Sequence, residues 1–355
     1  MAVLLVYKEN PQDPFLQALK RWIIPLSSKA SYFRFRHAER GRFESNEINV
    51  RLRRKIDNPN ITVIMDWNGL INKEELLLIK SKGIIYFRYI NGFTSLHCGH
   101  IADQTEFFDH LRLVDFFMVG ERTHVSILRD YGINAIHCNW FADPTIYKPI
   151  KNFFRRDIYD FFFVGTVNSH WSRNRQAFLE ILSKKFKTVI IAGPDANIDN
   201  AHCLPQITYE PIVNLLQNQS KIVCGSDYLP SVIPYNNQIK NALIEYDLDY
   251  TIRGRTFTSL ASARAYLVES HEEIELLFEK GKEILTWKSF DELLSIADRA
   301  IGDKEYLESI GNAGYNAVIS QHTVFHRLQL VEQLSGQLLF PDLKRYISWT
   351  NSKHR

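Results

Sequence analysis

Short apolar runs alternate along this chain with longer runs in which apolar and polar residues recur at helical spacing. The short runs are rich in β-branched and aromatic residues, which favours strands, and the longer runs favour helices. Such alternation is typical of βαβ units that build a parallel sheet covered by helices. The pattern therefore predicts an α/β fold of the Rossmann-like type. In the first half, strands are expected at 3–7, 61–66, 84–89, 116–119 and 135–139.

Helices are expected between these strands, at residues 14–22, 73–82 and 122–131. Gly83 and Gly132 follow the last two, and a glycine after a charged last turn is a common helix stop. Pro144 and Pro149 then interrupt the pattern before a strongly apolar strand starts it again. Because 355 residues exceed one ordinary core, we place a domain boundary near residue 150.

The second half repeats the alternation and becomes helical after Ser289. Strands are expected at 160–164, 188–192, 221–224 and 265–269, with helices at 173–185, 210–217 and 257–263. The segment 227–253 breaks the pattern with Pro230, Pro234 and an acidic aromatic run, which indicates an inserted loop.

Composition favours an intracellular protein. The first residues turn charged at Lys8, and no run approaches the roughly 18 apolar residues of a membrane span, so we expect a cytoplasmic location. Four widely spaced cysteines in a large chain favour reduced thiols over a disulfide scaffold.

The most informative local signal is FFFVGTVNSHWSRNR, residues 161–175, where a buried strand ends in Gly165-Thr166 and a polar loop leads into a helix. A helix that follows a parallel strand presents free N–H groups and a positive dipole, which suit a phosphate. Arg173 and Arg175 would add fixed positive charge, and Gly165 allows close backbone approach. The alternative is an ordinary helix start with solvated arginines.

A second arginine segment, Arg253-Gly-Arg255-Thr-Phe-Thr258-Ser259, precedes a helix and an apolar strand. In a doubly wound sheet it would also lie at the carboxyl-end crevice where ligands bind. The two segments together favour a diphosphate pocket. Alone, this one is also compatible with a basic turn capped by threonine or serine.

The second half resembles the glycosyl-transferring domain of the CgeB-like (spore-maturation) group, a relative of group 1 glycosyltransferases. The resemblance is carried in order by YDFFFVGT with Arg-x-Arg, AGP at 192–194, SKIV at 220–223, RTFTSLASARAYLVE, LFEKGKEILTWKSFDEL and GNAGYNAVISQHTVFHR. It implies a GT-B fold, with two Rossmann-like domains whose parallel sheets face a central cleft. It also implies transfer of a sugar, most simply a hexose, from a UDP- or GDP-linked donor.

The resemblance implies roles for several residues. Gly193 and Pro194 of the AGP triplet would join the donor site. The loop 165–175 is similar in layout to the donor-phosphate loop of phage DNA glucosyltransferases, and by that likeness Arg175 and Arg255 would contact the donor diphosphate. Where these relatives carry a glutamate that holds the ribose, this chain has Thr258, which supplies no charge.

The resemblance also implies a division of labour along the chain. Residues 1–150 would form the acceptor-side domain and 151–335 the donor-binding domain, while 336–355 would be a helical segment crossing back to the first. GT-B enzymes generally stabilise the departing diphosphate with arginines, a lysine and helix dipoles. We therefore expect no metal and no cofactor, with the nucleotide-sugar as co-substrate.

Positive charge is concentrated in one run although the whole chain carries only +3. Residues 29–55 hold nine lysines and arginines against three acids, with Phe33, Phe35 and Phe43 interleaved. This run suits an anionic surface or membrane, or an acceptor such as a glycan, a lipid-linked sugar, a protein or a nucleic acid. The alternative is a solvated basic loop with a few anchoring aromatic residues.

The catalytic candidates are His97, His100 and Asp103, which follow an expected strand. An inverting enzyme would need one of them as a general base, whereas a retaining enzyme would need none. Ordinary loop packing is the alternative, and a zinc site is disfavoured because no separated second ligand pair follows.

Three functions are compatible with these features. The leading one is a soluble glycosyltransferase. A catalytically silent GT-B protein that binds a nucleotide or glycan, or scaffolds a partner, is suggested by Thr258. A DNA glycosyltransferase of the phage type is suggested by the basic run and by the likeness of the loop 165–175, and salt-dependent DNA binding would distinguish it.

Overall fold

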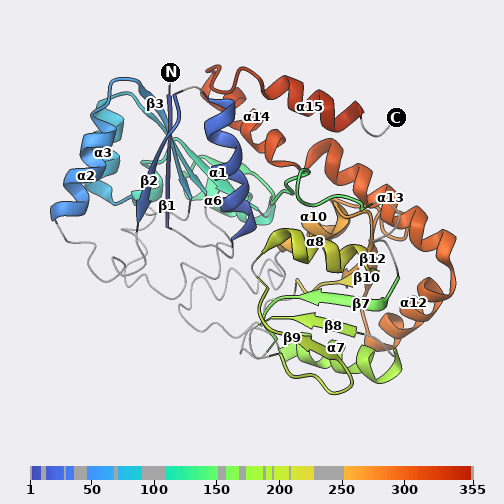
Figure 1. Cartoon of the computed structure of the whole chain (residues 1–355). Coiled ribbons are helices and arrows are strands. Elements are labelled where there is room, and N and C mark those ends of the chain that lie inside the picture. Colours follow the sequence, from blue (N-terminus) through green and yellow to red (C-terminus); the bar gives the residue numbers. More distant parts are fainter. Residues whose placement is uncertain are drawn as a thin grey trace. The chain divides into compact units, whose positions relative to one another are not determined.

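The computed structural model describes residues 2–8, 13–27, 29–35, 46–67, 71–89, 109–120, 122–150, 157–167, 173–186, 189–193, 196–207, 209–227 and 252–352. The chain divides into two compact units, drawn in Figure 1. The first unit holds the described residues up to Asn139 together with Val324–Trp349, and the second holds those from Trp140 to Thr323 together with those from Thr350 onward.

The first unit is built on a parallel sheet that has six strands among the described residues. Its strand order is β2-β1-β3-β4-β5-β6, which places β2 at one edge. The strands are β1 (Ala2–Lys8), β2 (Ser31–Phe35), β3 (Ile61–Trp67), β4 (Ile85–Tyr89), β5 (Phe116–Val119) and β6 (Ala135–His137). Val6 and Ile64 of the central strands are fully buried, as expected where helices cover a parallel sheet.

Helices pack against this sheet and are capped by the residues that precede them. Asp13 accepts the N–H groups of Phe15 and Leu16 at the start of α1, and Asn72 forms a capping box with Glu75 at the start of α3. The helices of this unit are α1 (Pro14–Leu26), α2 (Asn46–Ile56), α3 (Lys73–Ser81), α6 (Arg122–Asp130), α14 (Val324–Ser335) and α15 (Leu343–Ser352).

The two helices from the end of the chain pack beside α1, as Figure 1 shows. The ring of Trp22 lies 4.8 Å from that of Phe325 in α14 and 5.0 Å from that of Tyr346 in α15. These edge-on aromatic contacts tie α14 and α15 to the first unit. The domain limits at residues 150 and 335 stay predictions.

The second unit carries another parallel sheet, again with six strands among the described residues, in the order β12-β11-β10-β7-β8-β9. The strands are β7 (Tyr159–Val164), β8 (Val189–Ala192), β9 (His202–Leu204), β10 (Ser220–Cys224), β11 (Ala265–Glu269) and β12 (Leu285–Trp287). The helices are α7 (Arg173–Lys185), α8 (Glu210–Asn218), α10 (Gly254–Leu260), α11 (Glu272–Glu275), α12 (Phe290–Gly302) and α13 (Lys304–Gln321). Phe161, Phe163 and Phe178 fill the core between β7 and α7.

Two parallel sheets with helices are what the alternating pattern predicts. The structure adds β2, β9, β12, α2 and α11, which the pattern did not indicate. None of the described helices has the length and apolar character needed to cross a bilayer. Cys138, Cys203 and Cys224 carry free thiols, and Cys98 lies outside the described residues.

Candidate functional site

Two glycines meet at the carboxyl edge of the second sheet. Gly165 follows β7, has a φ of +148° and donates its N–H to the carbonyl of Ala192 at 3.0 Å. A Cβ placed on Gly193, just after β8, would lie 2.1 Å from the carbonyl oxygen of Gly165. Glycine is required at position 193 because the two backbones touch, and at position 165 because of its positive φ and the Arg255 side chain beside it. The loops after β7 and β8 are therefore held together at the point where parallel sheets bind ligands.

Arg255 lies across the end of β7. Its side chain comes from the first turn of α10, donates from Nη1 to the carbonyl of Val164 at 2.8 Å, and lies 4.9 Å from the ring of Phe163. The same guanidinium fills the space beside Gly165, where an added Cβ would be 2.7 Å from Nη1. The hydrogen bond and the cation–π contact hold the guanidinium in one place next to the glycine loop.

Arg175 joins it from α7. The residue is only 7% exposed, and Nη1 donates to the carbonyl of Thr166 at 3.2 Å. Its Nε has no hydrogen-bond partner among the described residues. Burial, and then the nearby charges of Arg255 and Arg253, lowers the pKa of Arg175 to about 9. A buried cation with an unused donor, close to two further arginines, is a site that an oxyanion would stabilise.

A buried acidic group contacts the backbone of this arginine cluster. Asp227 accepts the backbone N–H of Arg253 at 3.2 Å and donates its own backbone N–H to Glu269 at 3.0 Å. His271 Nε2 lies 3.4 Å from the Asp227 carboxylate. Burial, and then the charge of Asp227, raises the pKa of Glu269. Sequence reasoning missed this group, although Glu269 ends an apolar strand and Asp227 follows another.

Thr258 and Ser259 lie inside the packing of α10. The Thr258 hydroxyl donates to the carbonyl of Arg255 at 3.2 Å, one turn earlier in the helix. The Ser259 hydroxyl accepts from Gln217 Nε2 at 3.1 Å and is fully buried. Both hydroxyls therefore have partners within the protein.

The structure brings Gly165, Thr166, Gly193, Arg175 and Arg255 together, with Arg253 near enough to affect the charge of Arg175. Arg173 is the first residue of α7, but its side chain is outside the description. The remaining candidates, Pro194, His97, His100 and Asp103, lie outside the described residues. Over the part of the chain that is described, no group of three potential ligands is arranged to hold a metal.

Residues 173–333 match the model of a family described as glycosyl transferase-like. The matched segment runs from the start of α7 into α14, so it includes Arg175, Gly193 and Arg255. No curated protein matches the sequence.

Several solved structures share the fold. HepE from Anabaena, solved with UDP, has a TM-score of 0.66 and 11% identity over 95% of this chain and 100% of its own. Sucrose-phosphate synthase from Thermosynechococcus elongatus has a TM-score of 0.64 and 9% identity, over 94% of this chain and 99% of its own. An α-glucosyltransferase solved with UDP and a 13-mer DNA has a TM-score of 0.61 and 8% identity, over 95% of this chain and 100% of its own. The predicted fold class is confirmed: the chain is α/β, with two Rossmann-like units of the GT-B type.

Proposed function

We propose that this protein is a glycosyltransferase that moves a sugar from a nucleotide-sugar donor to an acceptor. The observation that carries the proposal is the arginine pair of buried Arg175 and half-buried Arg255, packed against the glycine loops of β7 and β8. The glycosyl transferase-like match over 173–333 supports it. The UDP and UDP-glucose bound to HepE favour a UDP-linked hexose over the GDP-linked alternative.

The donor diphosphate is proposed to bind to the guanidinium groups of Arg175 and Arg255, beside the closely packed backbone of Gly165 and Gly193 and next to Thr166. Arg253 adds charge, and the predicted contributions of Arg173 and Pro194 belong to the same proposal. Thr258 and Ser259 enter only as supports of α10, because their hydroxyls already have partners. Ribose recognition is left to groups other than Thr258.

The chemistry proposed for this site is displacement at the anomeric carbon. The bond from that carbon to the diphosphate oxygen breaks, and its electron pair leaves with the nucleoside diphosphate. An acceptor hydroxyl oxygen forms the new bond and gives up its proton, to His97, His100 or Asp103 if the reaction inverts, or to the leaving phosphate if it retains. Fixed guanidinium groups in a buried site stabilise the charge that develops on the leaving group.

The finer features of the proposal rest on the sequence resemblance. The order of motifs supports the CgeB-like subtype, and the arginine cluster supports metal-independent transfer. The acceptor is proposed to be held by the first unit. DNA is kept as one acceptor to test because one structural neighbour was solved with it.

The test begins with ligand binding. UDP, GDP, ADP, CMP and TDP are screened by thermal shift, since a ligand that binds only the folded state raises the melting temperature. We expect UDP to stabilise the protein and Arg255→Ala to remove most of the shift. Arg299→Ala is the matched control, because the Arg299 guanidinium lies over the ring of Tyr306 on α13, outside the cluster.

Turnover then separates enzyme from binding protein. The protein is incubated with a UDP-sugar and candidate acceptors, and the released UDP is measured by chromatography. We expect UDP release from the wild type and little from Arg255→Ala. If UDP binds and no sugar donor is turned over with any acceptor, the silent binding protein is the better description. If no nucleotide binds at all, the arginine cluster is not a donor site.

A further inference from the structure

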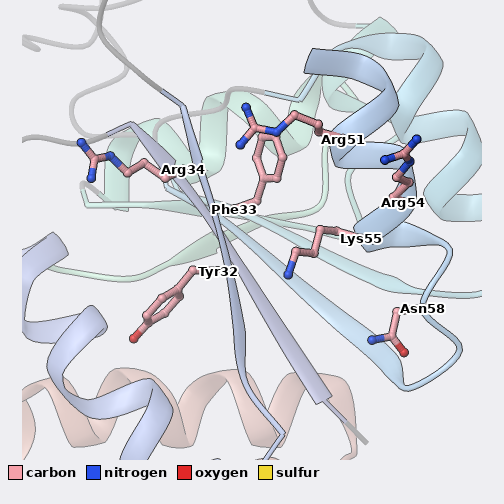
Figure 2. Close-up of a pocket in the computed structure, with 7 residues that line it drawn as sticks. All are labelled: Tyr32, Phe33, Arg34, Arg51, Arg54, Lys55 and Asn58. Carbon is pink, nitrogen blue, oxygen red and sulfur yellow. The ribbon is translucent and has the colours of Figure 1, made fainter. Parts of the chain in front are cut away.

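An open pocket lies in the first unit, between the edge strand β2 and the helix α2 (Figure 2). Its volume is about 740 Å³, which is in the range of small-molecule sites. The described residues that line it are Tyr32, Phe33, Arg34, Arg51, Arg54, Lys55 and Asn58. Four of these are cations and none is an acid, so the pocket is positively charged.

Helix α2 supplies three of the four charges. Arg51, Arg54 and Lys55 are spaced i, i+3 and i+4 along it, and such positions are neighbours on one helix face, about 5–6 Å apart at Cβ. Arg54 and Lys55 are exposed, and neither is paired with a carboxylate of the described residues. Their positive charge is therefore available to an anion that enters the pocket.

Two cations of this unit that do not line the pocket are paired with carboxylates. Arg53, on the same helix, pairs with Glu74 at 3.2 Å, and Lys82 pairs with Asp57 at 2.7 Å. Among the described residues of α2, Arg54 and Lys55 in the pocket thus differ from Arg53, whose charge is compensated by a carboxylate. A pocket of this volume favours a compact anion over a long polyanion such as nucleic acid, which needs an extended basic surface.

The aromatic residues of the pocket are already in use. The Tyr32 hydroxyl donates to the carbonyl of Lys20, and the Phe33 ring is buried in the core with the Arg51 guanidinium 5.9 Å from it. Asn58 accepts the backbone N–H of Asn60 at 3.0 Å, which leaves its amide nitrogen to donate. The groups that remain for a ligand are hydrogen-bond donors and positive charges. Recognition of oxyanions is therefore favoured over stacking on bases or sugar rings.

We propose that this pocket binds a phosphate-bearing ligand, with Arg54 and Lys55 as its main contacts and Arg51 and Asn58 beside them. Several separated charges in a pocket of this size suit a diphosphate or a phosphorylated sugar better than a single small ion. The identity of the ligand rests on the proposed function: if the protein is a glycosyltransferase, the phosphate-bearing ligand is the charged end of its acceptor. The same chemistry comes from a soluble sugar phosphate or from a phospholipid headgroup, and the experiment separates these sources.

The first measurement is pyrophosphate binding by calorimetry. The pocket variant is Arg54→Gln with Lys55→Gln, and the matched control is Arg53→Gln with Lys82→Gln, which removes the same charge from pairs outside the pocket. Every protein also carries Arg255→Ala, which weakens pyrophosphate binding at the donor cluster. We expect the pocket variant to lose at least about tenfold in affinity and the control to stay within about twofold, since exposed pairs contribute little.

Equal losses of pyrophosphate affinity in both variants would show that only the overall charge of the protein matters, and this would overturn the proposal. Unchanged pyrophosphate affinity in the pocket variant would overturn it as well. Glutamine keeps the helix propensity of α2, and circular dichroism melts check that every variant folds. If wild-type protein fails to bind UDP while the pocket still takes pyrophosphate, the donor assignment fails and this site stands.

The last step identifies the source of the phosphate. Glucose 6-phosphate competing with pyrophosphate would support a soluble acceptor. Sedimentation with phosphatidylglycerol vesicles but not phosphatidylcholine vesicles, lost in the pocket variant alone, would support a headgroup. If the protein binds duplex DNA but not pyrophosphate, and the pocket variant loses the DNA binding, the proposal of a compact ligand is overturned and the pocket binds nucleic acid.

Discussion

The guanidinium of Arg255 occupies the space that a side chain on Gly165 would need. An added Cβ would lie 2.7 Å from Nη1 and 3.0 Å from Nη2, while Nη1 also donates to the carbonyl of Val164. The absence of a side chain at Gly165 thus places a positive charge against the end of β7. Residues 90 positions apart in the sequence form one side of the proposed donor site.

Gly165→Ala is expected to weaken UDP binding by about tenfold and to destabilise the protein by about 1–3 kcal/mol. The stability loss comes from the φ of +148°, which residues with a Cβ rarely adopt, and the binding loss from displacement of Arg255. Urea denaturation and UDP calorimetry measure the two effects. Gly302→Ala is the control, because nothing lies within 4 Å of its added Cβ. Unchanged UDP affinity in Gly165→Ala would argue against the proposed geometry.

The regular elements with a clean period are predictable from the sequence. The limits expected for β5, α7 and β11 are those of the structure, because each has apolar residues at a consistent spacing and clear ends. In contrast, β2 is the edge strand of its sheet, with one neighbour and fewer buried positions, and α2 is the next described element along the same basic run. The run 29–55 holds many cations and few apolar residues, so its hydrophobic pattern does not predict a strand and a helix. β12, with three residues, is too short for periodicity to show.

The candidate site was predictable only in part for a related reason. Arg175 follows Gly165 by ten positions and Arg255 follows Gly254 directly, so each arginine can be read together with a glycine in a short window. The contacts of Asp227 with Glu269 and His271 join residues 42 and 44 positions apart, and only the parallel order of β10 and β11 brings them together. No short motif carries that information.

Arg175→Gln is expected to weaken UDP binding by roughly 1.5–3 kcal/mol and yet to raise the melting temperature of the ligand-free protein by a few degrees. The native arginine is buried, leaves Nε without a partner among the described residues and is close to Arg253 and Arg255. Burial and the neighbouring positive charges destabilise the folded protein only while Arg175 is protonated. This destabilisation is therefore fully present at pH 7, below the lowered pKa of about 9, and it diminishes above that pH.

Melting curves at pH 7 with and without UDP test this trade-off, and Arg299→Gln is the control on a more exposed guanidinium. A variant that is less stable than the wild type without ligand would show that Arg175 is a structural residue. The assignment of Arg175 to the donor diphosphate would then lose its physical basis.

Ser259→Ala is expected to cost about 1–2 kcal/mol of stability while leaving UDP affinity within about twofold. The change removes the acceptor of the Gln217 amide in a fully buried position, and an unsatisfied buried donor is costly. Urea denaturation gives the first quantity and calorimetry the second. A large loss of UDP affinity at unchanged stability would instead give Ser259 a direct contact with the donor.

Metal removal is expected to leave turnover of the nucleotide-sugar nearly unchanged. The positive charge that stabilises the leaving diphosphate is proposed to come from Arg175 and Arg255, and the nearest buried carboxylates, Asp227 and Glu269, already bind backbone N–H groups. UDP release is measured with excess EDTA and again after Mg²⁺ or Mn²⁺ is added. If EDTA abolishes turnover and a divalent cation restores it, the leaving group depends on a metal. In that case Arg255→Ala should retain most of its activity at saturating Mg²⁺, whereas the arginine-based site predicts that no cation rescues it.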